Sequence, residues 1–260
     1  MKTEMQCRQE MAQTGRRIYD MGLVAGVDGN FSVRLSADRI LATPTGMSKG
    51  DMKPEDMVVV NAHGKKIHGL RNATSELEMH LEIYRLRPDV HAVIHAHPPV
   101  ATGYAAAGVA LNKALVSEAI MALGCVPLAP YGTPGTPELK VAMAGLIPRH
   151  DAILMANHGV VVYAQALEQA LWKLEAVEHF AKISLVTEIL GKEKLLSEEQ
   201  VQKLLKARQA YLGLNAAPER IPDCPVASDS RSQTIAPEQK AAGVRSIVDG
   251  LIRELNLRGG

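Results

Sequence analysis

Three shortages in the sequence each argue against a class of function. Aromatic residues make up 3% of the 260 residues, with one Trp, so recognition of single-stranded nucleic acid by base stacking is not expected. The formal net charge of +1 provides no broad field for DNA, RNA or an anionic membrane. No stretch reaches the roughly 18 apolar residues that a membrane-spanning helix needs.

Cysteine is also scarce. The three cysteines are odd in number and far apart, so no disulfide framework is expected, and a reducing cytosol fits best. The N-terminal residues are too charged for a visible signal peptide, which predicts a cytoplasmic protein. With 47% hydrophobic residues the chain can bury an ordinary core, as one domain with an appendage or as two small domains.

Two histidines close a short apolar run in the stretch His91–Pro99, which reads H-A-V-I-H-A-H-P-P. Its β-branched residues predict a buried strand. Alternate side chains of a strand share one face, so His95 and His97 are expected to point the same way about 7 Å apart along the chain. Two neutral imidazoles so placed can bind one metal ion, commonly zinc, although histidines near a strand end also occur as ordinary hydrogen-bonded groups.

A third histidine follows a second apolar run. His158 stands in Asn157-His158-Gly159, directly after the predicted strand 152–156. Two strands that end in histidines could supply the three protein ligands of a catalytic zinc site, which keeps one position open for substrate. The sequence therefore predicts a metal centre made by His95, His97 and His158.

Two stretches rich in hydroxyl groups precede these histidines. Thr43-Pro44-Thr45-Gly46 is expected to form a loop, and Ala73-Thr74-Ser75-Glu76-Leu77-Glu78 to open a helix. Ser75 and Glu78 have capping-box spacing, which predicts Ser75 as the N-cap and Glu76 as the first helical residue. The free amides and positive dipole end of a helix start suit a phosphate group, but a serine that only caps the helix gives the same pattern.

The remaining pattern predicts a domain of mixed strands and helices. Helices are expected at 4–26, 100–108, 117–123, 138–147, 166–190 and 197–212, with Ser197 as the cap of the last one. Further strands are expected at 31–35, 40–42, 57–61, 66–67, 126–129 and 160–164. The composition changes at about residue 215, so residues 1–214 are expected to form the main domain.

The C-terminal residues have a different pattern. Residues 215–236 hold three prolines and three serines without hydrophobic periodicity, which is typical of a linker. In 237–260 an apolar stripe recurs at helical spacing: Val244, Ile247, Val248, Leu251, Ile252 and Leu255. So short an amphipathic helix is marginal alone in water. It could fold back on its own domain or oligomer, or dock into another protein.

One ordered set of motifs resembles the class II aldolase/adducin family: Gly29-Asn30, Thr43-Pro44-Thr45-Gly46, Ser75-Glu76, His95-Ala96-His97 and Asn157-His158-Gly159. The resemblance covers roughly residues 5–213 and is greatest to the L-fuculose-1-phosphate aldolases. The joint motif is specific, whereas each piece alone is common. The resemblance implies an α/β fold, a three-layer α/β/α sandwich with a mostly antiparallel central sheet. It also implies a homotetramer with active sites between subunits.

The resemblance also implies roles for individual residues. His95, His97 and His158 would hold Zn²⁺, and Glu76 would be the acid/base group and ligate the metal when substrate is absent. The phosphate of the substrate would be bound by Gly29, Asn30, Thr45, Gly46, Thr74 and Ser75. Tyr211 matches a catalytic tyrosine near the C-terminal end of the family domain.

The implied reaction cleaves a (deoxy)ketose 1-phosphate, such as L-fuculose 1-phosphate, between C3 and C4. The products are dihydroxyacetone phosphate and a short aldehyde such as lactaldehyde. Zinc stabilises the resulting enediolate without a Schiff-base lysine, and a carboxylate beside the metal can move the proton at C3. In the family a tyrosine of the neighbouring subunit serves the leaving aldehyde oxygen, but the matching stretch 114–122 has Ser117 and Glu118 and no tyrosine. This departure leaves the substrate open.

Other enzymes of the same scaffold are alternatives: a methylthioribulose-1-phosphate dehydratase, a sugar-acid-phosphate decarboxylase or a pentulose-phosphate 4-epimerase. The epimerases have Asp where Glu76 stands, whereas the dehydratase and the decarboxylase share the metal set. A non-enzymatic, adducin-like interaction module ranks last, because such modules lack the metal histidines that this sequence contains.

The C-terminal pattern resembles the short amphipathic helices that tether enzymes inside bacterial microcompartments. Aldolases of fucose and rhamnose degradation are cargo of this kind. The resemblance therefore implies a shell protein as a partner of 237–257, and a place in the cytoplasm inside a microcompartment.

Overall fold

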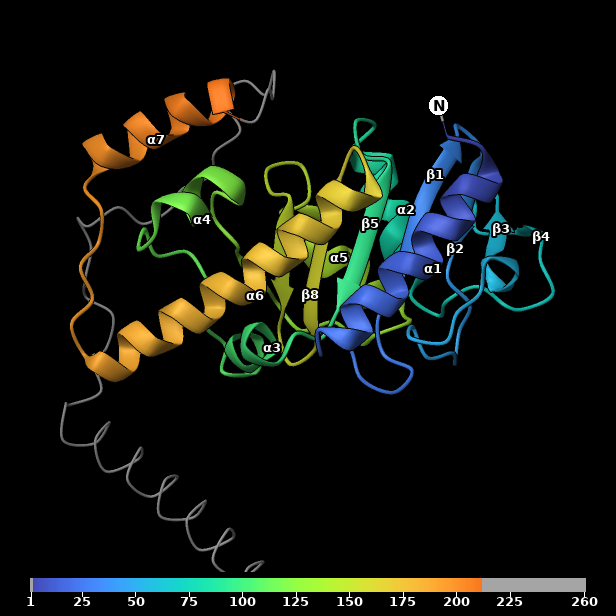
Figure 1. Ribbon diagram of the computed structural model, residues 1–260, viewed down its shortest axis with the longest axis horizontal. Coiled ribbons are helices and arrows are strands. Elements are labelled where there is room, and N and C mark those ends of the chain that lie inside the picture. The colour runs from blue at the N-terminus through green and yellow to red at the C-terminus, as the bar shows by residue number, and fades with distance from the viewer. Residues whose placement is uncertain (1, 212–260) are drawn as a thin grey trace, which may run out of the picture.

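The computed structural model of the protein describes residues 2–211, apart from the side chains of 209–211, and in these residues an eight-stranded sheet carries helices on both faces (Figure 1). The strands are β1 Asn30–Ser36, β2 Arg39–Ala42, β3 Val58–Val60, β4 Lys66–His68, β5 Ala92–Ala96, β6 Leu128–Ala129, β7 Ala152–Met155 and β8 Gly159–Ala164. The helices are α1 Glu4–Asp20, α2 Leu77–Leu86, α3 Pro99–Ala106, α4 Ser117–Ala122, α5 Pro137–Ala144, α6 Leu167–Leu190 and α7 Glu198–Tyr211, with a 3-10 turn η1 at Pro54–Asp56.

The strands lie in the order β4-β3-β2-β1-β5-β8-β7-β6. Every neighbouring pair is antiparallel except β6 and β7, which are parallel. This confirms the predicted mostly antiparallel central sheet. The register sets His95 of β5 opposite Asn30 on one neighbouring strand and opposite Val161 on the other, so the first metal-binding candidate lies in the middle of the sheet.

Alternate residues of the central strands enter two separate cores, one on each face of the sheet. Ile94 and Val162 belong to the core under α1, α3 and α6, together with Met11 and Leu174. Their chain neighbours Val93, Val161 and Tyr163 belong to the opposite core, which also holds Met79 and Ile83 of α2 and Leu139 and Met143 of α5. The three-layer sandwich predicted from the sequence is therefore confirmed.

A third, small core joins α4 and α7 through Ala114, Ile120 and Val201, and Figure 1 shows α4 lying between α7 and α6. Ser197 caps α7 as predicted. Its hydroxyl oxygen accepts a hydrogen bond from the backbone amide of Gln200 at 3.3 Å, and its own amide donates to Gln200 Oε1 at 2.8 Å. This is a reciprocal capping box.

Two predicted helix ends are wrong. The first helix ends at Asp20 instead of residue 26, because Gly22 with φ +68° begins a turn. Ser75 is not the N-cap of α2, and Glu76 is not its first helical residue. Glu76 itself is the N-cap with non-helical φ −95° and ψ 19°, and its amide donates to Thr74 Oγ1 at 3.3 Å. Glu78, the other half of the expected capping box, pairs instead with Lys140 Nζ at 2.9 Å.

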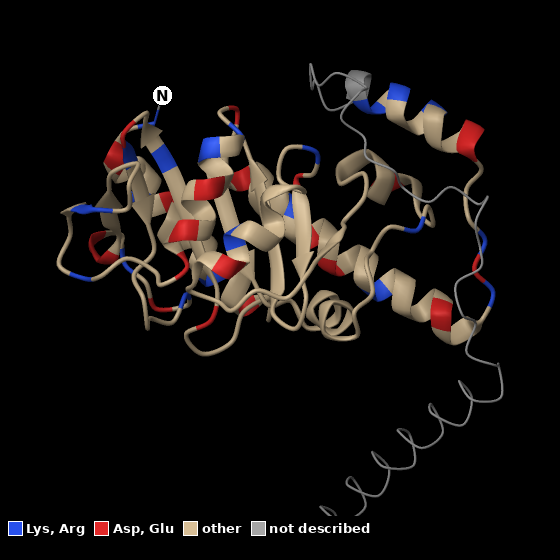
Figure 2. Cartoon of the chain, turned by 180° about the vertical axis from the view of Figure 1, so that it is seen from behind, with Lys and Arg blue, Asp and Glu red and all other residues tan. Residues whose placement is uncertain are grey.

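The predicted linker 215–236 and helix 237–260 lie outside the described residues, as does the domain boundary at 214. Acidic and basic residues are interspersed over the described chain in Figure 2. None of the helices described here combines the length and the apolar content needed to cross a membrane.

A charge cluster ties the two helical layers together at the start of β7. Asp151, just before β7, contacts Arg87 Nη2 at the end of α2 (2.9 Å) and Lys173 Nζ of α6 (2.8 Å). Arg87 also donates to the carbonyl oxygen of His150 at 3.2 Å. Burial would raise the pKa of Asp151, but the charges of Lys173 and Arg87 outweigh it and lower the pKa to about 2.

Asp151→Asn should reduce the free energy of unfolding at neutral pH by about 3 kcal/mol, because Lys173 loses its carboxylate partner and Arg87 keeps only Asp89. The folded-state pKa of about 2 lies below the ordinary 3.8. The carboxylate therefore contributes stability above roughly pH 4 that is lost as the pH falls toward 2. Urea unfolding should show that the difference in free energy of unfolding between the wild type and the variant is smaller at pH 2 than at pH 7.

The control is Asp89→Asn, because that carboxylate also contacts Arg87 but its side chain is 37% exposed, against 23% for Asp151. Its effect should stay below about 1 kcal/mol. A difference in free energy of unfolding between the wild type and Asp151→Asn that is equal at both pH values would contradict this account of the cluster.

Candidate active site

Three histidines meet at one end of the central strands. His95 lies in β5, His97 follows that strand directly, and His158 lies in the turn between β7 and β8. One ring nitrogen from each lies within 4.8 Å of the others, and the ring centroids are between 4.6 and 5.2 Å apart. The structure thus brings together the three residues that the sequence predicts.

The partners of the histidines fix which ring nitrogens carry protons. His95 Nδ1 lies 2.9 Å from the carbonyl oxygen of Val160, which only accepts, so Nδ1 carries the hydrogen and Nε2 keeps a lone pair. His97 Nδ1 lies 3.3 Å from Asp28 Oδ2, which assigns the proton in the same way. The two Nε2 atoms then face each other with lone pairs at 3.0 Å.

The carboxylate of Glu76 completes this group. Its Oε2 lies 3.2 Å from His95 Nε2, and its Oε1 lies 3.6 Å from His158 Nε2. Oε2 is buried and has no hydrogen-bond partner, and such an atom is costly unless a cation is near. Lone pairs that converge without a proton between them repel, whereas two nitrogen ligands of a tetrahedral zinc lie about 3.3 Å apart. The residues present therefore fit a divalent cation.

Burial and neighbouring charges set the pKa values of the imidazole and carboxylate ligands so that both can bind a metal ion. Burial lowers the pKa of His95 to about 3, against the opposing charge of Glu76, so the imidazole is neutral at physiological pH and can act as a ligand. Burial would raise the pKa of Glu76, but its hydrogen-bonding contact with His158, together with the other nearby histidine rings, outweighs burial and lowers the pKa to about 2. The carboxylate is therefore ionised.

Two glycines allow the main chain to approach the histidines. A Cβ atom on Gly159 would lie 2.5 Å from His97 Cδ2 and 2.7 Å from the carbonyl oxygen of Ala96. Gly29 has φ +73°, and a Cβ atom there would lie 2.9 Å from the carbonyl oxygen of His95. Glycine is thus required at both positions, which explains two of the motif glycines.

The hydroxyl-rich loops are joined to each other beside this site. Pro44 and Ala73 form a β-bridge, the amide of Thr45 donates to the Asn72 carbonyl (3.1 Å), and the amide of Thr74 donates to the Thr43 carbonyl (3.0 Å). Thr45, Gly46 and Ser75 are exposed, whereas Asn30 and Thr74 are buried. The structure brings the two predicted phosphate loops side by side, and phosphate binding by them remains a prediction.

Sequence reasoning missed a buried polar stripe between α2 and β1. Glu76, His80 and Tyr84 are spaced about one helical turn apart. His80 and Tyr84 contact Asn30, Ser32 and Arg34, which alternate along the strand. His80 contacts Asn30 Oδ1 at 2.6 Å and Ser32 Oγ at 2.8 Å. Burial lowers the pKa of His80 to about 4 despite the charge of Glu76. Polar residues every fourth position on an otherwise apolar helix face were the available signal.

Lys49 is a second residue without a sequence prediction. Its side chain is 1% exposed, and Nζ donates to the carbonyl oxygens of Val27, at 3.0 Å, and of Met47. Burial lowers the pKa of Lys49 to about 8, against the charge of Asp28. The lysine therefore ties the loop that carries Asp28 and Gly29 to the loop that follows Gly46.

The structure says less about the two catalytic tyrosines that the family resemblance implies. Ser117 and Glu118 open α4, and no tyrosine lies in 114–122. Tyr211 is the last residue of α7, but its side chain lies outside the description, so its catalytic role remains a prediction.

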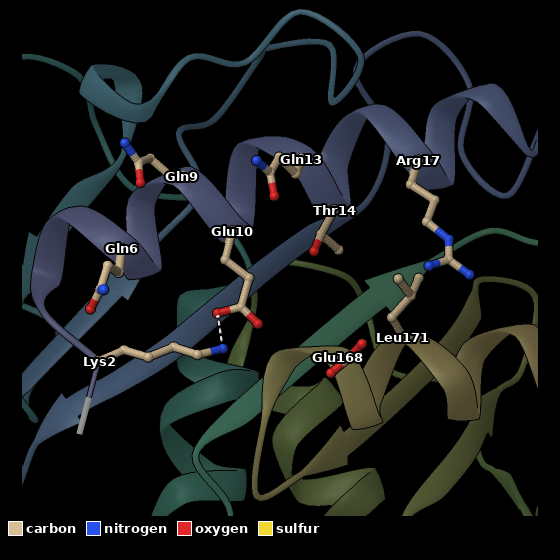
Figure 3. Close-up of a pocket in the computed structure, with 9 residues that line it drawn as sticks. All are labelled: Lys2, Gln6, Gln9, Glu10, Gln13, Thr14, Arg17, Glu168 and Leu171. Atoms are coloured by element: carbon tan, nitrogen blue, oxygen red, sulfur yellow. Dashed lines mark hydrogen bonds and ion pairs between the residues drawn. The ribbon is translucent and has the colours of Figure 1, made fainter.

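A different hollow lies on the α1 side of the sheet, between α1 and the start of α6 (Figure 3). Its lining is mainly polar and includes Gln6, Gln9 and Gln13. The ion pair of Lys2 Nζ with Glu10 Oε2 at 2.8 Å spans part of it. None of the three clustered histidines lines this hollow.

His158→Ala should remove one of the three nitrogen ligands and leave the chain with substoichiometric metal after dialysis. Asp28→Asn, which weakens the partner of His97 Nδ1, should lower metal affinity roughly 10–100-fold. Metal analysis and competition with a chromophoric chelator measure both effects. His179→Ala is the control, because His179 is exposed on α6. Equal metal retention by His158→Ala and His179→Ala would contradict the site.

Comparison with known proteins shows the family. The sequence profile of the Class II Aldolase and Adducin N-terminal domain matches residues 9–185. The chain is 37% identical over 207 residues to a 5-deoxy-D-ribulose 1-phosphate aldolase of Bacillus thuringiensis serovar kurstaki, a match that covers 78% of this chain and 96% of the relative. It is 33% identical over 186 residues to a 3-oxo-tetronate 4-phosphate decarboxylase of Escherichia coli O6:H1, covering 70% of this chain and 87% of the relative.

The fold comparison agrees with these sequence matches. A solved L-fuculose 1-phosphate aldolase superposes with a TM-score of 0.73 at 34% identity, covering 77% of this chain and 94% of that protein. The histidine cluster, the eight-stranded sheet and the sequence matches have one common explanation. The chain belongs to the class II aldolase/adducin family, as one of its metal-dependent aldolase enzymes.

Proposed function

We propose that the protein is a zinc-dependent aldolase that cleaves a deoxyketose 1-phosphate to dihydroxyacetone phosphate and a short aldehyde. The observation that carries this proposal is the position of Glu76. Its ionised carboxylate lies within 3.2 Å of His95 Nε2 and 3.6 Å of His158 Nε2, on the same side of the sheet as the hydroxyl-rich loops. An acid/base group, metal ligands and candidate phosphate donors are thus near neighbours.

The ligands of the metal would be His95, His97 and His158, with Glu76 as a further ligand when substrate is absent. Imidazole nitrogens together with a carboxylate oxygen are a typical zinc set. Zinc bound there supplies a Lewis acid that stabilises the negative charge of an enediolate without a Schiff-base lysine.

The protein residues bind the substrate and move the protons. The phosphate is held by Gly29, Asn30, Thr45, Gly46, Thr74 and Ser75, which fixes the position of the reacting carbons. When the C3–C4 bond breaks, its electron pair stays on C3 and the C4 hydroxyl loses its proton to become an aldehyde. The single proton that the C4 hydroxyl loses balances the one that C3 gains: Tyr211 would relay it from the aldehyde oxygen, and the ionised carboxylate of Glu76 would take it up and deliver it to C3. The active sites would lie between the subunits of a homotetramer, and the tyrosine that the family supplies from the neighbouring subunit has no match in 114–122.

A second candidate is supported by the similarity to the 3-oxo-tetronate 4-phosphate decarboxylase. A 3-oxo acid of this kind loses CO₂ with its electron pair left on the adjacent carbon, and the product is again the enediolate of dihydroxyacetone phosphate. The same carboxylate can protonate it. The greater identity to the 5-deoxy-D-ribulose 1-phosphate aldolase, 37% against 33%, supports the ketose phosphate as the first candidate. The L-fuculose 1-phosphate aldolase fold match supports it as well.

The zinc-loaded full chain should release dihydroxyacetone phosphate and an equal amount of aldehyde from one of the deoxyketose 1-phosphates. The panel is 5-deoxyribulose, L-fuculose, L-rhamnulose and methylthioribulose 1-phosphates, with 3-oxo-tetronate 4-phosphate beside them. Because both reaction types yield dihydroxyacetone phosphate, the co-product decides between them. CO₂ from the sugar acid phosphate without aldehyde from any ketose would contradict the aldolase proposal.

Glu76→Gln is the matched variant in this panel. It keeps the size of the side chain and removes the proton-transfer group, so kcat should fall by about 10²–10⁴-fold while the histidines still bind metal. Turnover equal to that of the wild type would show that another group moves the proton at C3.

We also propose that residues 237–260 are a docking helix for a microcompartment shell protein, carried on the linker 215–236. The family profile ends at residue 185, and the 5-deoxy-D-ribulose 1-phosphate aldolase, which is covered over 96% of its length, matches only 78% of this chain. Deletion of 237–260 should therefore leave turnover and tetramer mass unchanged and abolish co-sedimentation with shell proteins. A deleted chain that unfolds or dissociates would favour a helix that folds back on its own core.

A further inference from the structure

A chain of buried hydrogen bonds runs from the middle of α2 to the candidate phosphate site. Tyr84 OH lies 2.9 Å from Ser32 Oγ, which lies 2.8 Å from His80 Nδ1, and His80 Nε2 lies 2.6 Å from Asn30 Oδ1. The four side chains are at most 6% exposed. None of these atoms belongs to the metal-binding group, yet the chain ends at Asn30, whose register partner is His95.

The side-chain amide of Asn30 can donate a hydrogen bond to a phosphate in only one of its two orientations. Its oxygen only accepts hydrogen bonds and its nitrogen only donates them. Phosphate oxygens act mainly as acceptors, so the NH₂ group must be turned to the ligand and Oδ1 away from it. In the structure Oδ1 is turned toward His80 Nε2, which is the useful orientation.

The other hydrogen bonds in this series determine whether His80 can hold the Asn30 amide in that orientation. Oδ1 needs a donor, so His80 must carry its hydrogen on Nε2 and accept on Nδ1. The hydroxyl of Ser32 supplies that donor to Nδ1, and the hydroxyl of Tyr84 donates to Ser32 Oγ. Every buried donor and acceptor along this route is satisfied, which such networks require.

The opposite direction of donation is less well supported by the distances. With the hydrogen on Nδ1, His80 would donate to Ser32, Ser32 to Tyr84, and Tyr84 to the carbonyl oxygen of His91. That last distance is 3.5 Å, against 2.9 Å between Tyr84 and Ser32. Arg34 lies over the ring of Tyr84 at 4.7 Å and donates to its carbonyl oxygen at 2.6 Å, which holds Tyr84 in place for the shorter bond.

We propose that His80 is a positioning residue for substrate phosphate: held as its Nε2–H tautomer by Ser32, it turns the amide donors of Asn30 toward the phosphate. This inference rests on the proposed function, because it assumes that Asn30 binds the phosphate. It adds a residue that touches neither metal nor substrate and acts only through Asn30.

Two substitutions each remove one of the two hydrogen bonds of the His80 ring. In His80→Gln the amide nitrogen takes the place of Nε2 and can still donate to Asn30. In His80→Asn the amide takes the place of Nδ1, so the link to Ser32 is kept and the link to Asn30 is lost. The probe is inorganic phosphate, titrated by calorimetry into the metal-loaded full chain. Circular dichroism and thermal unfolding check that each variant folds.

His80→Asn should weaken phosphate binding by about 10-fold, the loss of one hydrogen-bond partner, and should raise KM more than it lowers kcat. His80→Gln should stay within about 3-fold of the wild type. The ¹⁵N resonances of the His80 ring, identified by their absence in His80→Gln, should show a protonated Nε2 and an unprotonated Nδ1.

A purely structural role would lower the affinity of both variants together with their thermal stability, and this result would overturn the inference. Asn30→Ala separates the inference from the proposed function. If Asn30→Ala weakens phosphate binding but His80→Asn does not, only the role of His80 fails. If the wild-type enzyme does not bind phosphate, or Asn30→Ala binds it unchanged, the phosphate site and the inference fail together.

Discussion

The structure depends on three acceptor atoms that point at one another without a proton between them. The Nε2 atoms of His95 and His97 are 3.0 Å apart, and Glu76 Oε2 is 3.2 Å from the first of them. Two outer partners, the Val160 carbonyl and Asp28, hold the ring hydrogens on the far nitrogens. Without a cation this arrangement is repulsive, and with one it is a binding site. The β5–β8 register and the glycine at 159 both serve to bring these atoms together.

The placement of α2 has a related explanation. Its polar residues Glu76, His80 and Tyr84 lie on the face that packs against β1 and not on the face toward solvent, and polar groups are buried at a cost unless each finds a partner. His80 and Tyr84 find partners in Asn30 and Ser32, and Arg34 donates to the carbonyl oxygen of Tyr84. One helix thus has Glu76 at its N-cap beside the histidines and His80 against the side-chain amide of Asn30.

Particular residues show how far the sequence predicts this arrangement. His95 and His97 are predictable because a strand alternates its side chains, and His158 because it follows a second apolar run. The sheet architecture follows from the family resemblance. Glu76 was assigned a helical position by its capping pattern and lies outside the helix instead, because its contacts with two histidines outweigh the local preference. His80 was missed because its role depends on Asn30 and Ser32, which are about 50 residues away along the chain, a separation that local patterns do not report.

The most direct measurement of the central claim is X-ray absorption at the metal edge of the zinc-loaded full chain, without substrate. The account predicts three imidazole nitrogens at about 2.0–2.1 Å and at least one oxygen in the first coordination sphere. A spectrum fitted by two imidazoles or fewer, or by a sulfur ligand, would contradict it.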